Sequence, residues 1–193
     1  MSIVTSRPEL PLTSKAIIFV FITLIDITLV RYAEILKPSG PYPGIYLAVA
    51  FMIAFGLWFG VWGVIAAYIG CFIGSGVPLG LPFQVNFLFS FADAFQVLIP
   101  LLAFRLLNSD ESLSSLRDVG VYLIFGWLIS NIIGGLWGSL SLLAAGVITM
   151  QEVQSIFTTW VLGNLFVTFL ITTVVLIFVS PYIRKHGLYI KYL

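Results

Sequence analysis

The stretch that decides the fold is residues 45–75, IYLAVAFMIAFGLWFGVWGVIAAYIGCFIGS, which contains no Asp, Glu, Lys or Arg. A helix needs about 20 apolar residues to cross a hydrocarbon core about 30 Å thick, so this stretch is too long for one crossing. Glycines interrupt its middle, and glycine weakens the interior of a helix. We therefore predict two short helices, at 45–58 and 60–75, joined near Phe59.

The rest of the chain has the same apolar character. Of its 193 residues, 60% are hydrophobic and only 9% are Asp, Glu, Lys or Arg, whereas soluble domains carry about 25% charged residues. The mean hydropathy is +1.11. So few charges cannot cover a soluble domain, and the apolar runs lack the alternation of outer-membrane strands. We predict an all-α integral membrane protein with a single membrane domain over residues 1–193. Its six predicted spans cover residues 15–32, 45–58, 60–75, 87–106, 119–145 and 156–179.

The positions of Lys and Arg predict the orientation in the lipid bilayer. If the N-terminus is cytoplasmic and the number of spans is even, seven of the nine basic residues lie in cytoplasmic segments. Only Arg31 and Lys37 lie on the other side. The positive-inside rule then favours both termini in the cytoplasm, in the cell membrane. Because the net charge is +1, we expect no nucleic-acid partner.

Residue counts argue against most kinds of catalysis. The chain has one cysteine, Cys71, and one histidine, His186, which lies in the polar C-terminal tail. An intrachain disulfide and a thiolate or imidazole metal centre are therefore not expected, and we predict no cofactor and no metal. No Ser or Cys has a plausible general base. The sequence predicts that the chain is not an enzyme and has no catalytic residues.

Ionisable residues within predicted spans are functional candidates because they are costly there. Two acids qualify, Asp26 and Asp93. Asn86, Asp93, Gln96 and Pro100 recur at spacings that place them near one helical face. A polar stripe on an apolar helix should face the bundle interior or a wet cavity. We predict that Asp93 and Gln96 contact a ligand; the alternative is a structural hydrogen-bond cluster between helices.

Two pairs of tryptophan and asparagine share a spacing of one helical turn. Trp127 precedes Asn131 in the fifth predicted span, and Trp160 precedes Asn164 in the sixth. An amide donates and accepts hydrogen bonds, so it can hold a polar ligand while the indole forms an apolar wall. We predict ligand contact for all four side chains; the alternative for tryptophan is an interfacial anchor.

Small residues at four-residue spacing predict close helix packing. Ser130, Gly134 and Gly138 follow this spacing in the fifth span, and Gly70 and Gly74 follow it in the third. Such residues let helix backbones approach closely in a membrane. We assign them to helix packing.

Three passages resemble one family in their order and spacing. They are the glycine-rich second and third spans from Gly44 to Gly74, the passage from Phe104 through the linker to Val119, and the last span from Thr159 to Pro181. Together they resemble the membrane-associated sensor domain family, type one, the N-terminal membrane module of many histidine kinases and diguanylate cyclases. The resemblance implies a compact bundle with a small-ligand pocket reached from the outer face. For the output, the alternatives are a longer chain, a separate signalling partner, or a membrane module that acts alone.

The chain also resembles the substrate-binding S-components of energy-coupling factor transporters. Those subunits are six-helix proteins of about this size, with glycine-rich second and third spans and an Asn early in the sixth. This resemblance implies transport with an ATP-driven coupling partner. Between Ile17 and Tyr32, however, the chain has none of the small residues with which those subunits dock. We predict a non-enzymatic membrane module that binds a small molecule and acts as a sensory input domain. A transporter subunit and a structural subunit of a larger membrane complex are the alternatives.

Overall fold

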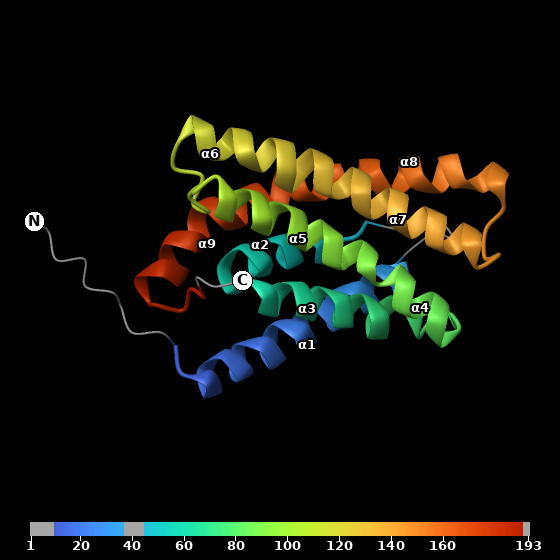
Figure 1. The fold of residues 1–193 in the computed structure, drawn as a ribbon, viewed down its shortest axis with the longest axis horizontal. Coiled ribbons are helices and arrows are strands. Elements are labelled where there is room, and N and C mark those ends of the chain that lie inside the picture. The colour runs from blue at the N-terminus through green and yellow to red at the C-terminus, as the bar shows by residue number, and fades with distance from the viewer. Residues whose placement is uncertain (1–9, 37–44, 191–193) are drawn as a thin grey trace, which may run out of the picture.

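The computed structural model of the chain describes residues 10–36 and 45–190, and every regular element in this part is helical (Figure 1). The all-helical prediction is therefore confirmed for the described residues. The elements are α1 (Leu12–Leu36), α2 (Ala48–Phe59), α3 (Val61–Cys71), η1 (Phe72–Gly76), α4 (Phe83–Phe89), α5 (Phe91–Leu106), α6 (Leu116–Val121), η2 (Tyr122–Ile129), α7 (Ser130–Ala144), α8 (Met150–Val167), η3 (Thr168–Thr172) and α9 (Thr173–Lys185).

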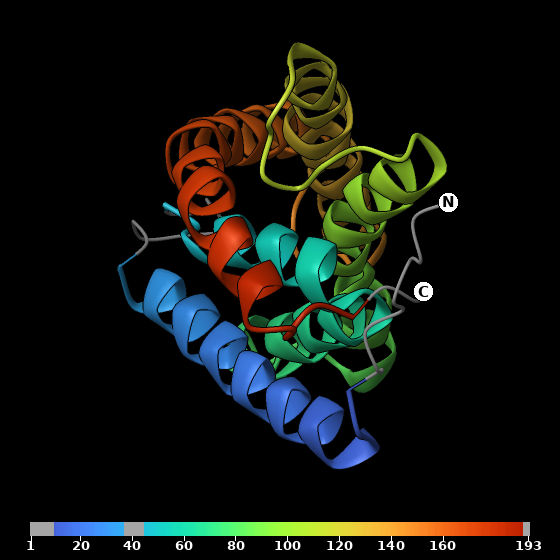
Figure 2. The ribbon, with the colours of Figure 1, turned by 90° about the vertical axis from the view of Figure 1, so that its left-hand side faces the viewer.

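Helix α2 lies at the centre of the bundle. Eleven of its 12 residues are buried, and Figure 2 shows the other helices arranged around it. A helix that is apolar all round is stable only when it is surrounded. At a rise of 1.5 Å per residue, α2 is about 18 Å long, which is shorter than the hydrocarbon core. It therefore covers only part of the length of the bundle.

Helices α2 and α3 are joined by a sharp turn at Gly60, whose φ angle of 62° favours glycine. The predicted junction near Phe59 lies at this turn. The two helices approach so closely that a Cβ atom added at Gly63 would lie 2.5 Å from the backbone nitrogen of Gly56. Glycine at this contact allows the two short helices to pack backbone against backbone.

Six helical segments can be compared with the six predicted spans. Four are long and apolar enough to cross a membrane, and two shorter apolar helices complete the set. The start of α1 and the end of α9 lie at the same end of the bundle (Figure 1), as an even number of crossings requires. The crossing of each segment and the side of the membrane on which the termini lie stay predictions. The four long segments are Leu12–Ile35, Phe83–Leu106, Leu116–Ala144 and Met150–Lys185, and the two shorter ones are Ala48–Phe59 and Val61–Gly76.

Two of the long helical segments begin before the predicted spans at 119–145 and 156–179, because a capping box forms at the start of each segment. Ser115 and Asp118 form one box before α6, and Thr149 and Glu152 form the other before α8. In each box two side chains satisfy backbone N–H groups that the first helical turn leaves free. The polar residues just before these two predicted spans therefore belong to the first turns of α6 and α8.

Three stretches of wide π-helical turns, η1, η2 and η3, interrupt the long helices. Side chains bond to backbone carbonyl oxygens at the start of two of them. Asn86 Nδ2 donates to the Phe72 oxygen at 3.0 Å, and the Tyr122 hydroxyl donates to the Thr168 oxygen at 2.7 Å. Such turns are rare and often occur at functional sites. Here they adjoin the polar side chains of the interior.

The small residues on α3 and η1 face α1. A Cβ atom added at Gly70 would lie 2.7 Å from Asp26 Cβ, and one added at Gly74 would lie 2.8 Å from Val30 Cβ. Both distances are shorter than real contacts between such atoms. Glycine at these two positions therefore sets the distance between the two helices.

The small residues on α7 lie against two predicted site residues. Gly134 faces the Gln96 side chain, and a Cβ atom at Gly138 would lie 2.5 Å from Trp160 Cη2. The buried Ser130 hydroxyl donates to a carbonyl of its own helix. These positions therefore bring α7 close to α5 and α8.

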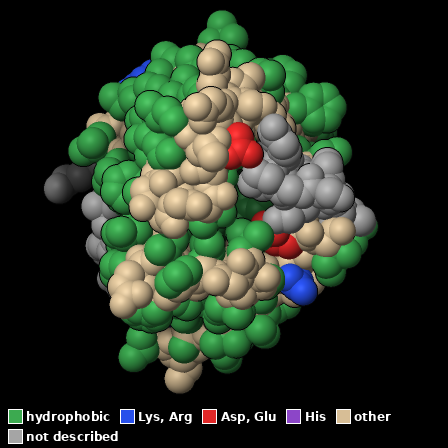
Figure 3. All heavy atoms as spheres, turned by 90° about the vertical axis from the view of Figure 1, so that its right-hand side faces the viewer, with side chains coloured by type: hydrophobic (Ala, Val, Ile, Leu, Met, Phe, Trp, Pro, Cys, Tyr) green, Lys and Arg blue, Asp and Glu red, His purple; other side chains and the backbone are tan. Residues whose placement is uncertain are grey.

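The end of the molecule that carries α4 and the α7–α8 turn is hollowed (Figure 3). Asp and Glu side chains lie at the edge of this hollow. This is the end opposite to the start of α1 and the end of α9 (Figure 1). If the termini are cytoplasmic, the hollow faces outward, where the family resemblance predicts the mouth of a ligand pocket.

Candidate functional site

Four buried polar residues, which we call the amide chain, lie where α5, α7, α8 and η3 meet; three of them bond through their side chains, and Asn164 takes part through its backbone oxygen. They are Gln96, Asn131, Asn164 and Thr168, and each is at most 1% exposed. Gln96 Nε2 donates to Asn131 Oδ1 at 2.9 Å. Asn131 Nδ2 donates to the Thr168 hydroxyl at 3.1 Å, and that hydroxyl donates to the Asn164 backbone oxygen at 2.7 Å. Gln96, Asn131 and Asn164, which were predicted as ligand contacts, are thus brought together. The hydrogen bonds among them and Thr168 are made within the protein.

The amide chain retains one free acceptor and one free donor. Gln96 Oε1 and Asn164 Nδ2 are buried and have no hydrogen-bond partner. A buried polar group without a partner costs about 1–3 kcal/mol. A small molecule with a donor and an acceptor, or ordered water, would satisfy both groups.

The two predicted tryptophans are half-buried and hold neighbouring helices. Trp127 Nε1 donates to the Leu165 oxygen at 2.8 Å, and its ring lies 6.0 Å from that of Phe169. Trp160 packs edge-on against Phe89 at 5.9 Å between ring centroids. Both indoles therefore fix how α8 and η3 pack on their neighbours. That Trp127 and Trp160 form an apolar wall of a ligand site stays a prediction.

Two interior acids and a tyrosine form a second polar group, which we call the acid cluster. Its members are Asp26, Tyr46 and Asp93. The Tyr46 hydroxyl donates to Asp93 Oδ2 at 2.5 Å. Asp93 Oδ1 and both oxygens of Asp26 are buried without a hydrogen-bond partner. Asp26 is 0% exposed and Asp93 is 1% exposed, so both carboxyl groups lie within the bundle, Asp26 near the middle of α1 and Asp93 in the first turn of α5.

The acid cluster and the amide chain are neighbours along α5. Asp93 and Gln96 are three residues apart on this helix, close to one turn. The predicted polar stripe of α5 therefore faces the interior on both turns. The polar members of the predicted stripe, however, have different partners. Asp93 bonds to Tyr46 in the segment before α2, Gln96 bonds to Asn131 of α7, and Asn86, which lies on α4, bonds to the start of η1.

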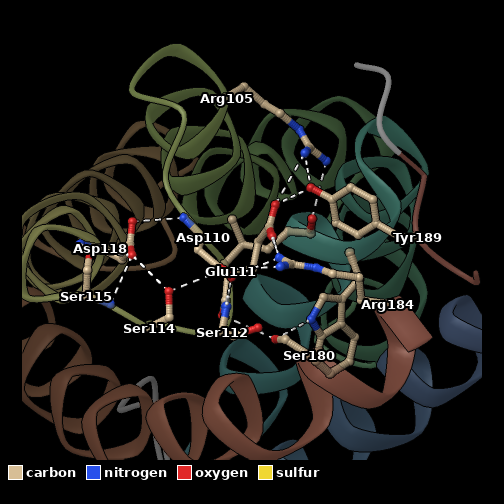
Figure 4. Close-up of polar contacts among 12 residues, drawn as sticks. Arg105, Asp110, Glu111, Ser112, Ser114, Ser115, Asp118, Ser180, Arg184 and Tyr189 are labelled. Atoms are coloured by element: carbon tan, nitrogen blue, oxygen red, sulfur yellow. Dashed lines mark hydrogen bonds and ion pairs between the residues drawn. The ribbon is translucent and has the colours of Figure 1, made fainter. Parts of the chain in front are cut away.

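The end of the bundle near the termini carries a charged cluster, the tail clasp (Figure 4). Its members are Arg105, Asp110, Glu111, Arg184 and Tyr189. Arg184 Nη2 lies 2.8 Å from both Asp110 Oδ1 and Glu111 Oε2. Arg105 Nη1 lies 3.3 Å from Glu111 Oε1, and the Tyr189 hydroxyl bonds to Arg105 and Glu111. The clasp thus joins the end of α5, the polar loop, α9 and the tail.

The charges of the clasp are set by its contacts. Burial raises the pKa of Asp110, but hydrogen bonds from Arg184 and Ser112 outweigh burial and hold this pKa at about 2. Burial and the neighbouring Glu111 carboxylate raise the pKa of Tyr189. Asp110 is therefore an anion and Tyr189 a neutral donor at physiological pH.

The clasp also reaches the C-terminal end of α2. The Ile190 amide donates to the Trp58 oxygen at 2.9 Å, and Arg105 Nη2 donates to the Ile190 oxygen at 3.1 Å. The Trp58 indole donates to the Ser180 hydroxyl at 2.8 Å, which donates to the Glu111 oxygen at 3.2 Å. One end of α2 is therefore tied to the tail, and the segment before its other end is tied to Asp93.

An open groove lies apart from these clusters, between α4 and α7. It has a volume of about 340 Å³ and a mostly apolar lining that includes Leu88, Trp137 and Leu140. None of the predicted ligand-binding residues lines it. The predicted residues converge on the interior instead.

Thr168, Tyr46 and the tail clasp were not predicted from the sequence as functional groups. Thr168 was detectable, because it follows Asn164 by one helical turn and extends its polar face. Tyr46 was not, since its partner Asp93 is distant in the sequence. Glu111 lies in a stretch that looks like a solvated linker, and its burial follows only from the tertiary fold.

A helical bundle with four long apolar helices and a polar interior defines a multi-pass membrane protein. A family model for MASE1, a membrane-associated sensor domain, matches residues 14–191, so the chain belongs to the MASE1 family. The predicted resemblance to membrane-associated sensor domains is confirmed. No curated protein and no solved structure matched the chain. The resemblance to transporter S-components stays a prediction.

Proposed function

We propose that the chain is a non-enzymatic sensory input module that binds a small molecule inside the helix bundle and reports it through the C-terminal tail. The observation that carries the proposal is the match to a sensor-domain family over residues 14–191. A signalling partner, covalently joined or separate, would receive the signal at the tail.

The proposed ligand site comprises Asp93 and the amide chain, with Trp127 and Trp160 bordering it. The unpaired Gln96 oxygen and Asn164 amide support a ligand that both donates and accepts hydrogen bonds. Binding of such a ligand would satisfy two groups that otherwise destabilise the bundle. It would also favour one arrangement of α5, α7 and η3 over others.

Helix α2 supplies a physical connection between the site and the tail. The segment before it bonds to Asp93 through Tyr46, and its last turn bonds to Ser180 and Ile190. Because α2 is buried on all sides, a displacement at one end would be transmitted along the helix as a rigid element. We expect ligand binding to change how firmly the tail clasp holds residues 183–190.

Native mass spectrometry of the purified full chain tests the ligand proposal. We expect a bound small molecule in the wild-type protein and its loss in Asp93→Ala and Asn164→Ala. Ser141→Ala is the matched control, because Ser141 only bonds to a carbonyl of its own helix; it should retain the molecule. Retention of the same molecule by both interior variants would show that the proposed site is wrong.

A further inference from the structure

The acid cluster holds more hydrogen-bond acceptors than donors. Three carboxylate oxygens, two from Asp26 and one from Asp93, have no partner. The cluster's donor, the Tyr46 hydroxyl, is already bonded to the remaining Asp93 oxygen. The two acids are close enough to interact electrostatically. A hydrogen-bond donor or a positive charge is therefore needed to compensate the three unpaired oxygens of Asp26 and Asp93.

No basic side chain of the described residues supplies that charge. The ion pairs of Arg105 and Arg184 lie in the tail clasp. The ionisable groups that interact with the two acids are Tyr46 and Cys71, which carry no positive charge in any state. Two buried carboxyl groups without a basic partner are costly when both are ionised.

The composition of the cluster restricts what can bind. Carboxylate and hydroxyl oxygens suit hard cations, and ion sites near the midplane of membrane bundles occur beside interrupted helices. The described residues contain no group of three or more His, Cys, Asp or Glu side chains that could hold a metal ion. If one of Asp26 and Asp93 is ionised and the other is protonated, a single monovalent cation makes the site electrically neutral.

We infer that Asp26 and Asp93 together bind one small monovalent cation, either an alkali-metal ion or a protonated amine. Asp26 and Asp93 supply the free oxygens, and Tyr46 holds the Asp93 carboxyl group in place. This inference deepens the proposed function by naming the charge of a ligand, and it shares Asp93 with the proposed ligand site. The cation would bind at the end of α2 that lies away from the tail.

The test is thermal unfolding of the full chain in detergent at constant ionic strength. Sodium, potassium and methylammonium chloride are compared with N-methylglucamine chloride, whose cation is too large for a buried site. A ligand that binds only the folded state raises the melting temperature. We expect a saturable rise with one of the small cations. The salts that raise it distinguish an alkali-metal ion from an amine.

Variants of Asp26 and Asp93 test whether these two acids cause the rise in melting temperature. Asp26→Asn and Asp93→Asn keep the side-chain shape and should abolish the cation-dependent rise. Glu152→Gln removes an acid of the helix α8 cap and should keep it. Equal melting temperatures of the wild-type protein in all four salts would overturn the inference, even if no interior variant folds. An undiminished rise in both Asn variants would also overturn it.

The outcomes separate this inference from the proposed function. If the salts are equivalent but native mass spectrometry finds a molecule that Asn164→Ala loses, the ligand site stands and the cation site is wrong. If the cation binds but changes at Asp93 do not alter the tail, the cation site stands and the sensory connection is wrong.

Discussion

Glu111 is the side chain on which the tail clasp depends. It is 5% exposed and lies between Arg105 and Arg184, while its backbone oxygen accepts from Ser180. A buried carboxylate between two guanidinium groups makes stronger hydrogen bonds than a neutral group in the same place. Loss of its charge therefore weakens both arginine contacts together.

We predict that Glu111→Gln lowers the free energy of unfolding by about 1–3 kcal/mol, because hydrogen bonds to a charged group contribute about that much. Thermal unfolding measures the change. Lys185→Gln is the control: this exposed neighbour of Arg184 should change stability by less than about 0.5 kcal/mol. Equal melting temperatures of Glu111→Gln and the wild-type protein would contradict the role of the clasp.

Asp110 gives the clasp a predicted pH dependence. Its pKa is about 2 in the folded chain against an ordinary value of 3.8, so the unfolded state binds protons more readily. The stabilisation is present above pH 3.8 and is lost as the pH falls towards about 2. Unfolding measured across this range should show the loss in the wild-type protein and less of it in Asp110→Asn. The same slope in both proteins would exclude Asp110 as the cause.

Residue spacing predicted the interior positions of Asp93, Gln96, Asn131 and Asn164 as polar members of a bundle, because a polar side chain in an apolar helix must face protein or water. It did not predict their partners. Partners depend on helix register and on long-range contacts such as Tyr46 with Asp93, which no local pattern contains.

Helix breaks were predictable where glycine causes them, and less so elsewhere. The reversal near Phe59 followed from glycine in an apolar run too long for one span. The early starts of α6 and α8 depend on the side chains of Ser115 and Thr149 acting as caps. The π turns leave no clear signature in the sequence, since their backbone geometry depends on the helices packed around them.

The contact between α2 and α3 yields a prediction for glycine. Gly63→Ala should destabilise the chain by about 1–3 kcal/mol, because the added methyl group meets the backbone of α2 and overpacking forces helices apart. Gly120→Ala is the matched control, since a Cβ atom at this helical glycine meets nothing within 4 Å. Thermal unfolding of the two variants compares them directly; equal stability would contradict the close contact of α2 with α3.

The orientation of the whole bundle can be tested with introduced cysteines, because the single native Cys71 is buried. Ser114 lies on the surface of the polar loop, and Val147 lies on the surface of the α7–α8 turn. We predict that a membrane-impermeant maleimide added to intact cells labels Val147→Cys and not Ser114→Cys. In inside-out vesicles the result should reverse. Labelling of Ser114→Cys in intact cells would contradict the predicted cytoplasmic termini.

At the scale of the whole molecule, we propose that helix α2 connects the polar interior with the tail. Hydrogen–deuterium exchange of the Ile190 amide, which donates to the Trp58 oxygen, tests it most directly. Tyr46 precedes the N-terminus of α2, the end that lies away from the tail. Tyr46→Phe removes its hydrogen bond with Asp93, which contributes about 1 kcal/mol. We predict exchange at Ile190 several-fold faster in Tyr46→Phe than in the wild-type protein, and no change in Tyr32→Phe, which alters an exposed tyrosine of α1. Identical exchange at Ile190 in all three proteins would contradict the connection.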